Sequence, residues 1–71
     1  MDKLNEIIKS LEEELKINGT ATYYALIKTI EDNELWTVLV MHFASCLWVD
    51  VKIINNSEYE NVVEMHLSKK L

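Results

Sequence analysis

One nearly uninterrupted apolar stretch, Leu35 to Ile54 (LWTVLVMHFASCLWVDVKII), constrains the folding of this chain more than any other feature. A membrane-spanning helix needs about 20 apolar residues. Here the uncharged run from Leu35 contains His42 and is closed by Asp50 and Lys52. We therefore predict that the stretch forms the core of a folded domain, and we expect no association with a membrane.

The apolar stretch can form either one buried helix or two buried strands. Hydrophobicity alone does not distinguish the two, because both would be apolar on every side. β-branched and aromatic residues favour a pleated strand. The stretch is rich in both kinds, with Trp36, Val38, Val40, Phe43, Trp48, Val49, Val51, Ile53 and Ile54. We therefore predict an antiparallel hairpin that turns near Ala44 and Ser45.

Residues 2 to 17 show the three-and-four spacing of an amphipathic helix. The apolar face of this helix would consist of Leu4, Ile7, Ile8, Leu11 and Leu15. Asp2 can cap the start of the helix, and Asn18-Gly19 can end it in a left-handed turn. We predict a helix whose apolar stripe packs on the rest of the domain.

Two shorter segments connect this helix to the apolar stretch. Thr20 to Ile30 (TATYYALIKTI) is rich in Thr, Tyr and Ile and predicts a strand, although it would also fit a short helix. Glu31 to Glu34 predicts a polar turn centred on Asp32-Asn33, a pair that tolerates the left-handed conformations of hairpin turns.

The last segment, residues 57 to 71 (SEYENVVEMHLSKKL), fits two structures. As a helix, it would begin with the capping-box pair Ser57 and Glu60, and its final lysines would suit the helix dipole. As a strand, it would alternate Tyr59, Val63, Met65 and Leu67 with Glu60, Glu64, His66 and Ser68. We favour the helix, and the strand remains an open alternative.

Together these elements predict an α+β fold in one domain, residues 1–71, in the order helix-strand-strand-strand-helix. A three-stranded antiparallel sheet would carry both helices on one face. This order resembles that of the double-stranded RNA-binding domain, whose RNA contacts come from a lysine cluster at the start of its last helix. The matching positions here are Glu58, Tyr59 and Glu60, so the resemblance does not imply RNA binding.

The expected turns also assign each strand residue to one face of the sheet, because cross-strand partners share a face. They pair Ile30 with Leu35 and Val40 with Val49. The helices should then cover a face that includes Tyr23, Ala25, Val38, Val40, Val49, Val51 and Ile53.

The opposite face of the expected sheet should be bare, and we predict that its apolar end binds a partner. That end would hold Tyr24, Leu39, Met41, Phe43 and Trp48. Monomers rarely expose apolar patches larger than about 300–600 Å². We therefore expect a protein partner or self-association at this patch, unless a different register or the last segment covers it.

The charge pattern excludes one class of partner. The chain carries a net charge of −5, it has no arginine, and its seven lysines are scattered along its length. Nucleic-acid binding depends on clustered cations that neutralise phosphates, so we expect no direct contact with nucleic acid. An acidic surface favours basic protein surfaces instead, and Glu31, Asp32 and Glu34 are candidates to contact one.

The small size of the chain points to association. A chain of 71 residues buries a small core and usually needs a disulfide, a metal or a partner for stability. Cys46 is the only cysteine, so no internal disulfide can form. We expect a homo-oligomer and, from the lone cysteine and the lack of a hydrophobic leader segment, a cytoplasmic location.

Few residues have the chemistry of a reactive site. His42, His66 and Cys46 are the soft metal ligands, and they lack the paired spacing of a zinc site. We expect Cys46 and His42 to be strand residues and the carboxylates to form a solvated surface. With one glycine, the chain has no phosphate-cradling loop. We therefore predict no catalytic residue, no metal, no cofactor and no enzymatic activity.

These features favour a non-catalytic acidic protein-binding module. By analogy of size and charge alone, a specific form is a small inhibitor that phages and other mobile elements encode against host nucleic-acid machinery, as anti-CRISPR proteins are. Its carboxylates would stand in for phosphates on a basic cleft. The alternative is an obligate homodimer with stacked sheets that serves as a structural or assembly protein.

Overall fold

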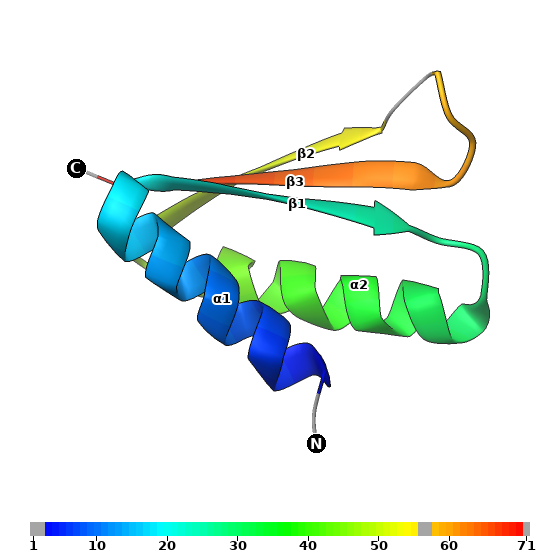
Figure 1. Ribbon diagram of the computed structural model, residues 1–71, viewed down its shortest axis with the longest axis horizontal. Coiled ribbons are helices and arrows are strands. Elements are labelled where there is room, and N and C mark those ends of the chain that lie inside the picture. The colour runs from blue at the N-terminus through cyan, green and yellow to red at the C-terminus, as the bar shows by residue number, and fades with distance from the viewer. Residues whose placement is uncertain (1–2, 56–57, 71) are drawn as a thin grey trace.

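Two helices and three strands make up the computed structural model, which describes residues 3–55 and 58–70. In chain order these are α1 (Lys3–Asn18), β1 (Thr20–Leu26), α2 (Ile30–Ala44), β2 (Val49–Asn55) and β3 (Val62–Lys69). The strands form an antiparallel sheet in the order β1-β3-β2. Both helices lie on the same side of this sheet (Figure 1).

This architecture confirms the α+β class, the three-stranded antiparallel sheet and the placement of both helices on one face. The order of the elements differs from the prediction, because it is helix-strand-helix-strand-strand. The first helix is confirmed. The strand expected over Thr20–Ile30 is confirmed for Thr20–Leu26, but Thr29 caps α2 and Ile30 begins it. Gly19 ends α1 with a φ of +82°, as the sequence predicts. The cap expected at Asp2 lies outside the described residues.

The hairpin expected over Leu35–Ile54 is wrong, because its first half belongs to α2 and only its second half is a strand. The polar turn expected at Glu31–Glu34 is the first part of the same helix. Ala44 is the last residue of α2, and Ser45 caps its end. The last segment forms β3, so the favoured helix is wrong and the strand alternative is correct over the residues of β3.

A capping box starts α2. The Thr29 hydroxyl accepts a hydrogen bond from the backbone N–H of Asp32 at 3.0 Å. In return, the Asp32 carboxylate accepts the backbone N–H groups of Thr29 and Lys28, both at 3.1 Å. Such reciprocal bonds satisfy donors that a helix start otherwise leaves unpaired. The carboxylates of Glu31 and Asp32 also suit the positive end of the helix dipole.

The central position of β3 changes the register. β3 pairs Tyr23 with Met65 on one side and Val51 with Leu67 on the other. The pairs expected between Ile30 and Leu35 and between Val40 and Val49 are therefore wrong. The face assigned to the residues of β1 and β2 is nevertheless correct. The helix side of these strands carries Tyr23, Ala25, Val49, Val51 and Ile53.

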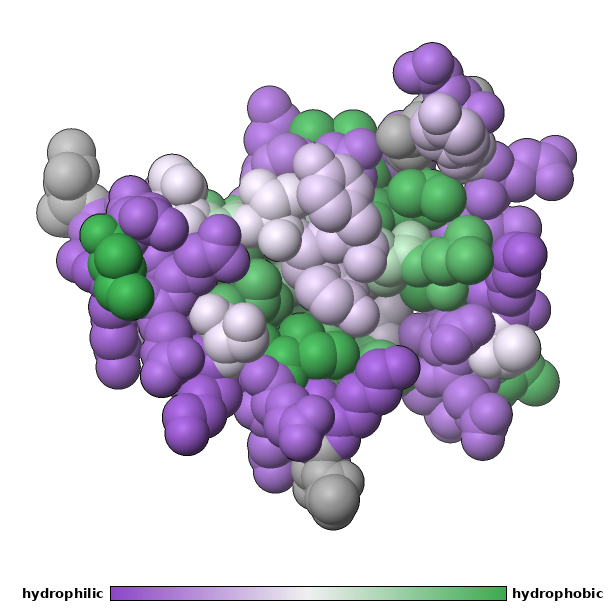
Figure 2. Space-filling view, in the orientation of Figure 1, coloured by the Kyte–Doolittle hydropathy of each residue, from purple (hydrophilic) through white to green (hydrophobic). Residues whose placement is uncertain are grey.

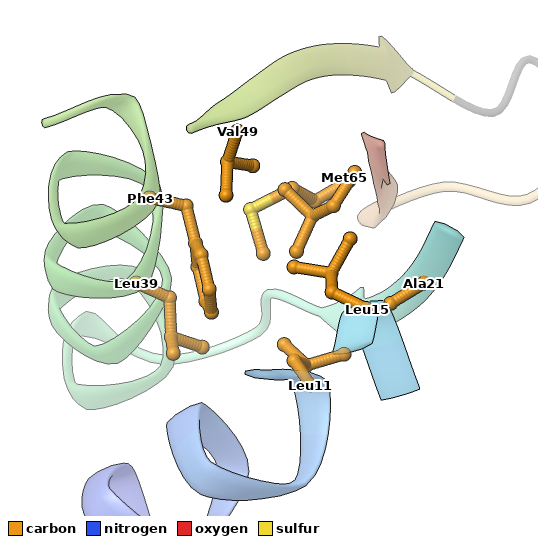
Figure 3. Close-up of a cluster of buried hydrophobic side chains, with 8 residues drawn as sticks. Leu11, Leu15, Ala21, Leu39, Phe43, Val49 and Met65 are labelled. Carbon is orange, nitrogen blue, oxygen red and sulfur yellow. The ribbon is translucent and has the colours of Figure 1, made fainter. Parts of the chain in front are cut away.

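The core lies between the helices and the sheet (Figure 3). Each helix contributes two buried side chains, and all three strands supply the rest. The cluster consists of Leu11, Leu15, Ala21, Leu39, Phe43, Val49, Met65 and Leu67. Because the apolar side chains of three strands and two helices converge here, this cluster fixes the position of α2 on the sheet.

The other side of the sheet carries no helix (Figure 1). Figure 2 presents the side of the molecule on which α1 and β1 lie toward the viewer, and pale and green surface of intermediate to high hydropathy occupies the middle of this view. Hydrophilic surface surrounds it. Within the described residues, neither helix is long and apolar enough to cross a membrane.

A matched pair of substitutions on α2 tests the helical structure of residues 30–44. Leu39 is fully buried, whereas Met41 is 63% exposed. We expect Leu39→Ala to lower the free energy of unfolding by about 2–5 kcal/mol, because it leaves a cavity in the core. Met41→Ala should change it by no more than about 0.5 kcal/mol. Urea denaturation followed by circular dichroism measures both, and equal losses would contradict this orientation of α2.

Acid stability tests the capping box. The backbone N–H of Lys28, together with Thr29, holds the pKa of Asp32 below its ordinary value. The folded chain therefore binds this proton less readily than the unfolded chain, so stabilisation is complete above the ordinary pKa and is lost as the pH falls through the lowered pKa. We expect the melting temperature of Asp32→Asn to fall less than that of the wild type between about pH 5 and pH 2.

Glu31→Gln is the control for this measurement. It removes the same charge from the same helical turn, but no described hydrogen bond of the capping box involves Glu31. This variant should keep the acid sensitivity of the wild type. Identical pH profiles for Asp32→Asn and the wild type would contradict a stabilising role of the ionised carboxylate.

Candidate protein-binding surface

α2 is apolar on two opposite sides. Its inner side packs into the core through Leu39 and Phe43. Ile30, Val38 and Met41 are nevertheless exposed, at 81%, 45% and 63%. A helix that is apolar all round is usually covered on all sides, so the exposed side of α2 has the character of a contact surface.

The exposed apolar side chains share one face of the helix. Residues 30, 34, 38 and 41 are separated by four, four and three positions, a spacing that places them above one another. We call Ile30, Glu34, Val38 and Met41 the outer face of α2. Glu31 adds a second exposed carboxylate beside Ile30. The face therefore combines an apolar stripe with negative charge at its N-terminal end.

The structure does not bring the five expected apolar contact residues together. Leu39 and Phe43 are fully buried in the core, because the helix turns them inward, so their expected exposure is wrong. Met41 lies on the outer face of α2. Tyr24 is exposed on the open side of the sheet, and Trp48 is partly exposed in the connection between α2 and β2.

The three expected acidic contact residues also lie in different environments. Glu31 and Glu34 are exposed on α2, as expected for contact residues. Asp32 is held in the capping box, where its carboxylate accepts two backbone N–H groups. The Asp32 carboxylate therefore stabilises the start of α2.

A polar cluster on the open side of the sheet was missed from the sequence. The His66 ring lies 2.9 Å from a Glu64 carboxylate oxygen through Nε2 and 3.4 Å from the Thr22 hydroxyl through Nδ1. These residues meet because Thr22 is the cross-strand partner of His66 and Glu64 is two positions away on the same strand. The alternation of polar residues in the last segment was the sequence signal that could have placed Glu64 and His66 on one face of a strand.

This cluster has the carboxylate–imidazole–hydroxyl order of a nucleophilic triad. The hydroxyl lies beyond the usual reach of about 2.6–3.2 Å for an activated nucleophile. The cluster borders an open hollow of about 510 Å³, which also includes Lys52. Cross-strand pairing on a solvated face accounts for the contacts, and they do not support a catalytic assignment.

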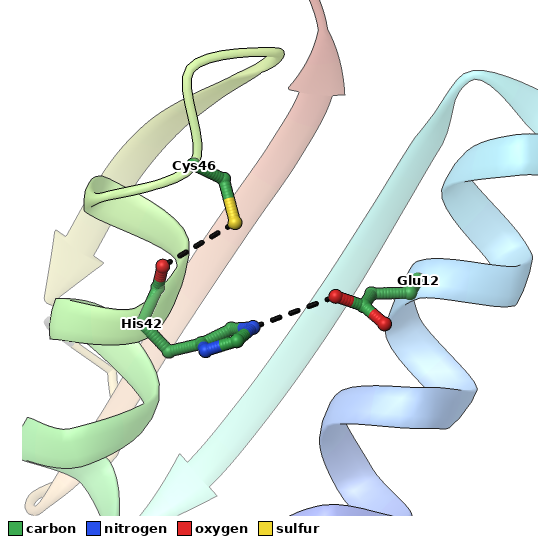
Figure 4. Close-up of polar contacts among 3 residues, drawn as sticks. All are labelled: Glu12, His42 and Cys46. Atoms are coloured by element: carbon green, nitrogen blue, oxygen red, sulfur yellow. Dashed lines mark hydrogen bonds and ion pairs between the residues drawn. The ribbon is translucent and has the colours of Figure 1, made fainter.

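The other histidine and the cysteine lie near the end of α2 (Figure 4). His42 reaches across to α1, where its Nε2 lies 3.5 Å from a Glu12 oxygen. The Cys46 thiol donates a hydrogen bond to the backbone carbonyl of His42 at 3.4 Å. Neither residue lies in a strand, in contrast to the prediction. In residues 3–55 and 58–70, no three His, Cys, Asp or Glu side chains converge as a metal site would require.

The exposed residues of α2 therefore form a candidate contact surface in the described part of the chain. Its apolar side chains have no role in the core, and its carboxylates give it a charge preference. No protein-family model, curated protein or solved structure matches this chain.

Proposed function

We propose that this protein is a non-catalytic acidic module that binds another protein through the outer face of α2. The observation that carries the proposal is the exposure of Ile30, Val38 and Met41 on a helix whose opposite side already fills the core. An amphipathic helix commonly binds by placing such a stripe in an apolar groove.

The charges define the kind of partner. Glu31 and Glu34 flank Ile30, and the whole chain carries a net charge of −5. The complementary surface is an apolar groove with lysine or arginine residues at one rim. Proteins that bind nucleic acid present clustered lysine and arginine residues to the phosphates. On such a surface the module would act as an inhibitor, with its carboxylates in the place of phosphates.

Two charge-introducing substitutions test the surface. We expect Val38→Asp combined with Met41→Asp to abolish capture of the partner, because burying an unpaired carboxylate in an apolar groove is strongly unfavourable. The measurement is affinity capture from an extract of the native host, with quantification of the bound proteins by mass spectrometry. Glu31→Lys combined with Glu34→Lys should weaken capture mainly at low salt.

Ile17→Asp is the control for these variants. Ile17 is 81% exposed near the end of α1 and does not belong to the outer face of α2. This variant should capture the same proteins as the wild type. Loss of capture in Ile17→Asp, or retention in the α2 double variant, would contradict the proposal.

The open side of the sheet favours a second candidate, a homodimer with stacked sheets. Exposed apolar side chains gather at one end of this side, on β1 and β2, and they are Tyr24, Leu26 and Ile54. Asp50 and Lys52 lie toward the other end of β2 and have opposite charges. A two-fold stack would bury these apolar side chains together with Glu64, which lies between Tyr24 and Ile54 and contacts the His66 ring at 2.9 Å.

Light scattering tests the stacked dimer. If the sheets stack, the purified protein should have twice the monomer mass, and Tyr24→Ser combined with Ile54→Ser should restore the monomer. Val38→Asp combined with Met41→Asp should leave the dimer intact, because those residues lie on the helix. A monomer at all concentrations would exclude this candidate and leave the first unaffected.

A further inference from the structure

β1 has an unpaired edge, and the register of the sheet identifies the residues whose backbone groups point outward there. β1 lies at one side of the sheet and pairs, among the described residues, with β3. The backbone N–H of Ile27 donates to Asn61 at 2.7 Å, and that of Lys69 donates to the carbonyl of Gly19 at 3.0 Å. In an antiparallel pair, alternate residues direct both backbone groups to the same neighbour. The odd-numbered residues of β1 therefore bond to β3.

The even-numbered residues of β1 direct their backbone N–H and C=O groups away from β3, in the plane of the sheet. These residues are Thr20, Thr22, Tyr24 and Leu26. Their N–H and C=O groups form the row of donors and acceptors that an additional strand would need. The β2 edge is less available, because the N–H of Val49 already donates to the Cys46 carbonyl at 3.3 Å.

Two hollows run beside this edge. One of about 310 Å³ lies between α1 and β1, and the other, of about 220 Å³, lies between the later part of β1 and the start of α2. Tyr23 lines both hollows. We call them together the β1 trough. The pale and green surface in the middle of Figure 2 shows that moderately hydrophobic groups are exposed on the side of the molecule where α1 and β1 face the viewer.

The floor of the trough is apolar and aromatic. Ile7 and Leu11 contribute from α1, and the Tyr23 ring stacks on Trp36 with 6.4 Å between centroids. Burial, with a smaller effect from the Asp32 carboxylate, raises the pKa of the Tyr23 phenol. Ile7, Leu11, Tyr23 and Trp36 therefore give the trough an apolar and aromatic part that suits aliphatic chain segments, beside Lys3 and Asp32 in the second hollow.

Lys3 at the start of α1 lines the second hollow, but the α1 rim of the first hollow is acidic. Glu6, Ser10 and Glu14 line it, and their spacing of four residues places them on one side of the helix. Glu6 and Glu14 are separated by about 12 Å along the helix axis. In a strand, residues four positions apart are separated by about 13 Å and lie on the same face. Two basic side chains spaced in this way therefore match the separation of the two carboxylates along the axis of α1.

Lysine and arginine fit this trough better than other residues. Their aliphatic stems can cover apolar surface while their charged ends remain at a polar rim. Here the stems would lie on Ile7 and Tyr23, and the charged ends would meet Glu6 and Glu14. A peptide with acidic side chains would meet these carboxylates with like charge.

We infer that the β1 trough binds an extended basic segment of another protein, which adds to the sheet as a fourth, antiparallel strand beside β1. Main-chain hydrogen bonds supply the affinity in this mode of recognition, and alternate side chains supply the specificity. The segment carries lysine or arginine at every second or fourth position on the helix side. The trough shares no residue with the outer face of α2, so this inference does not depend on the proposed function.

A synthetic peptide with the repeat (Lys-Thr)4, capped at both ends, tests the inference on the full chain. Hydrogen exchange measured by NMR should show that the N–H groups of Thr22 and Tyr24 exchange rapidly in the free protein and slowly with the peptide. The N–H groups of Tyr23 and Ala25 should be protected in both states, because they bond to β3. The matched peptide (Glu-Thr)4 should give no protection.

Methylation of the peptide backbone tests the pairing itself. In antiparallel pairing, peptide residues bonded to Thr22 and Tyr24 have their side chains on the open side of the sheet. These are the threonines when the lysines face α1. N-methylation of the threonines should therefore abolish binding, whereas N-methylation of the lysines should leave it intact. Binding that tolerates both modifications would overturn the inference.

Neutralising the rim tests the charge preference. Glu6→Gln combined with Glu14→Gln should weaken binding of (Lys-Thr)4 by roughly 2- to 30-fold at low salt. Glu13→Gln combined with Glu60→Gln makes the same change in net charge at exposed positions outside the trough, and it should have a smaller effect. Equal effects of the two double variants would overturn the assignment of the rim.

Two further outcomes would overturn the inference. The peptide could protect the N–H groups of Val51 and Ile53 on β2 instead of those on β1. Alternatively, Thr22 and Tyr24 could be protected without peptide in a concentration-dependent way. The second result would show that another copy of the chain occupies this edge.

Discussion

The packing of α2 against the sheet is the contact on which the rest of the structure depends. Leu39 and Phe43 insert between α1 and the sheet, where they meet core residues such as Met65. Because residues 30–44 are helical, three segments form the sheet, and β3 pairs with β1 on one side and β2 on the other. The same arrangement leaves β1 and β2 at the edges and turns Val38 and Met41 outward. The exposed surfaces of the protein therefore follow from the burial of one side of this helix.

The parts of the fold that could be predicted are those with a clear hydrophobic period. α1 has apolar residues on one side and charges on the others, and Gly19 marks its end. α2 has no such contrast, because Val38 and Met41 lie opposite Leu39 and Phe43. β-branched content then favoured a strand, but core packing and the Thr29–Asp32 capping box outweigh that preference. The capping box was the local signal that could have identified the helix.

The last segment of the chain shows a second reason why a structure could not be predicted from the sequence. The strand alternation from Val62 was visible, but Ser57 and Glu60 also matched the start of a helix. β3 pairs with two strands that lie far from it in the sequence, and local patterns do not contain such pairings. The contact between Thr22 and His66 could be located only with that register. Among the predicted contact residues, Tyr24 is exposed because its strand and its face of the sheet were predicted correctly, whereas Met41 is exposed because a helix turns it outward.

The acidic charge of the surface has a consequence for both exposed features. A free sheet edge and an apolar helix face both favour association between identical copies. Glu6 and Glu14 lie beside β1, Glu34 lies on the outer face of α2, and Glu31 lies next to that face. Contacts between identical copies at these surfaces would often place these like charges close together. The same carboxylates attract a basic partner. A net charge of −5 therefore opposes close contact between identical copies at these exposed surfaces, and it favours contact with a surface of opposite charge.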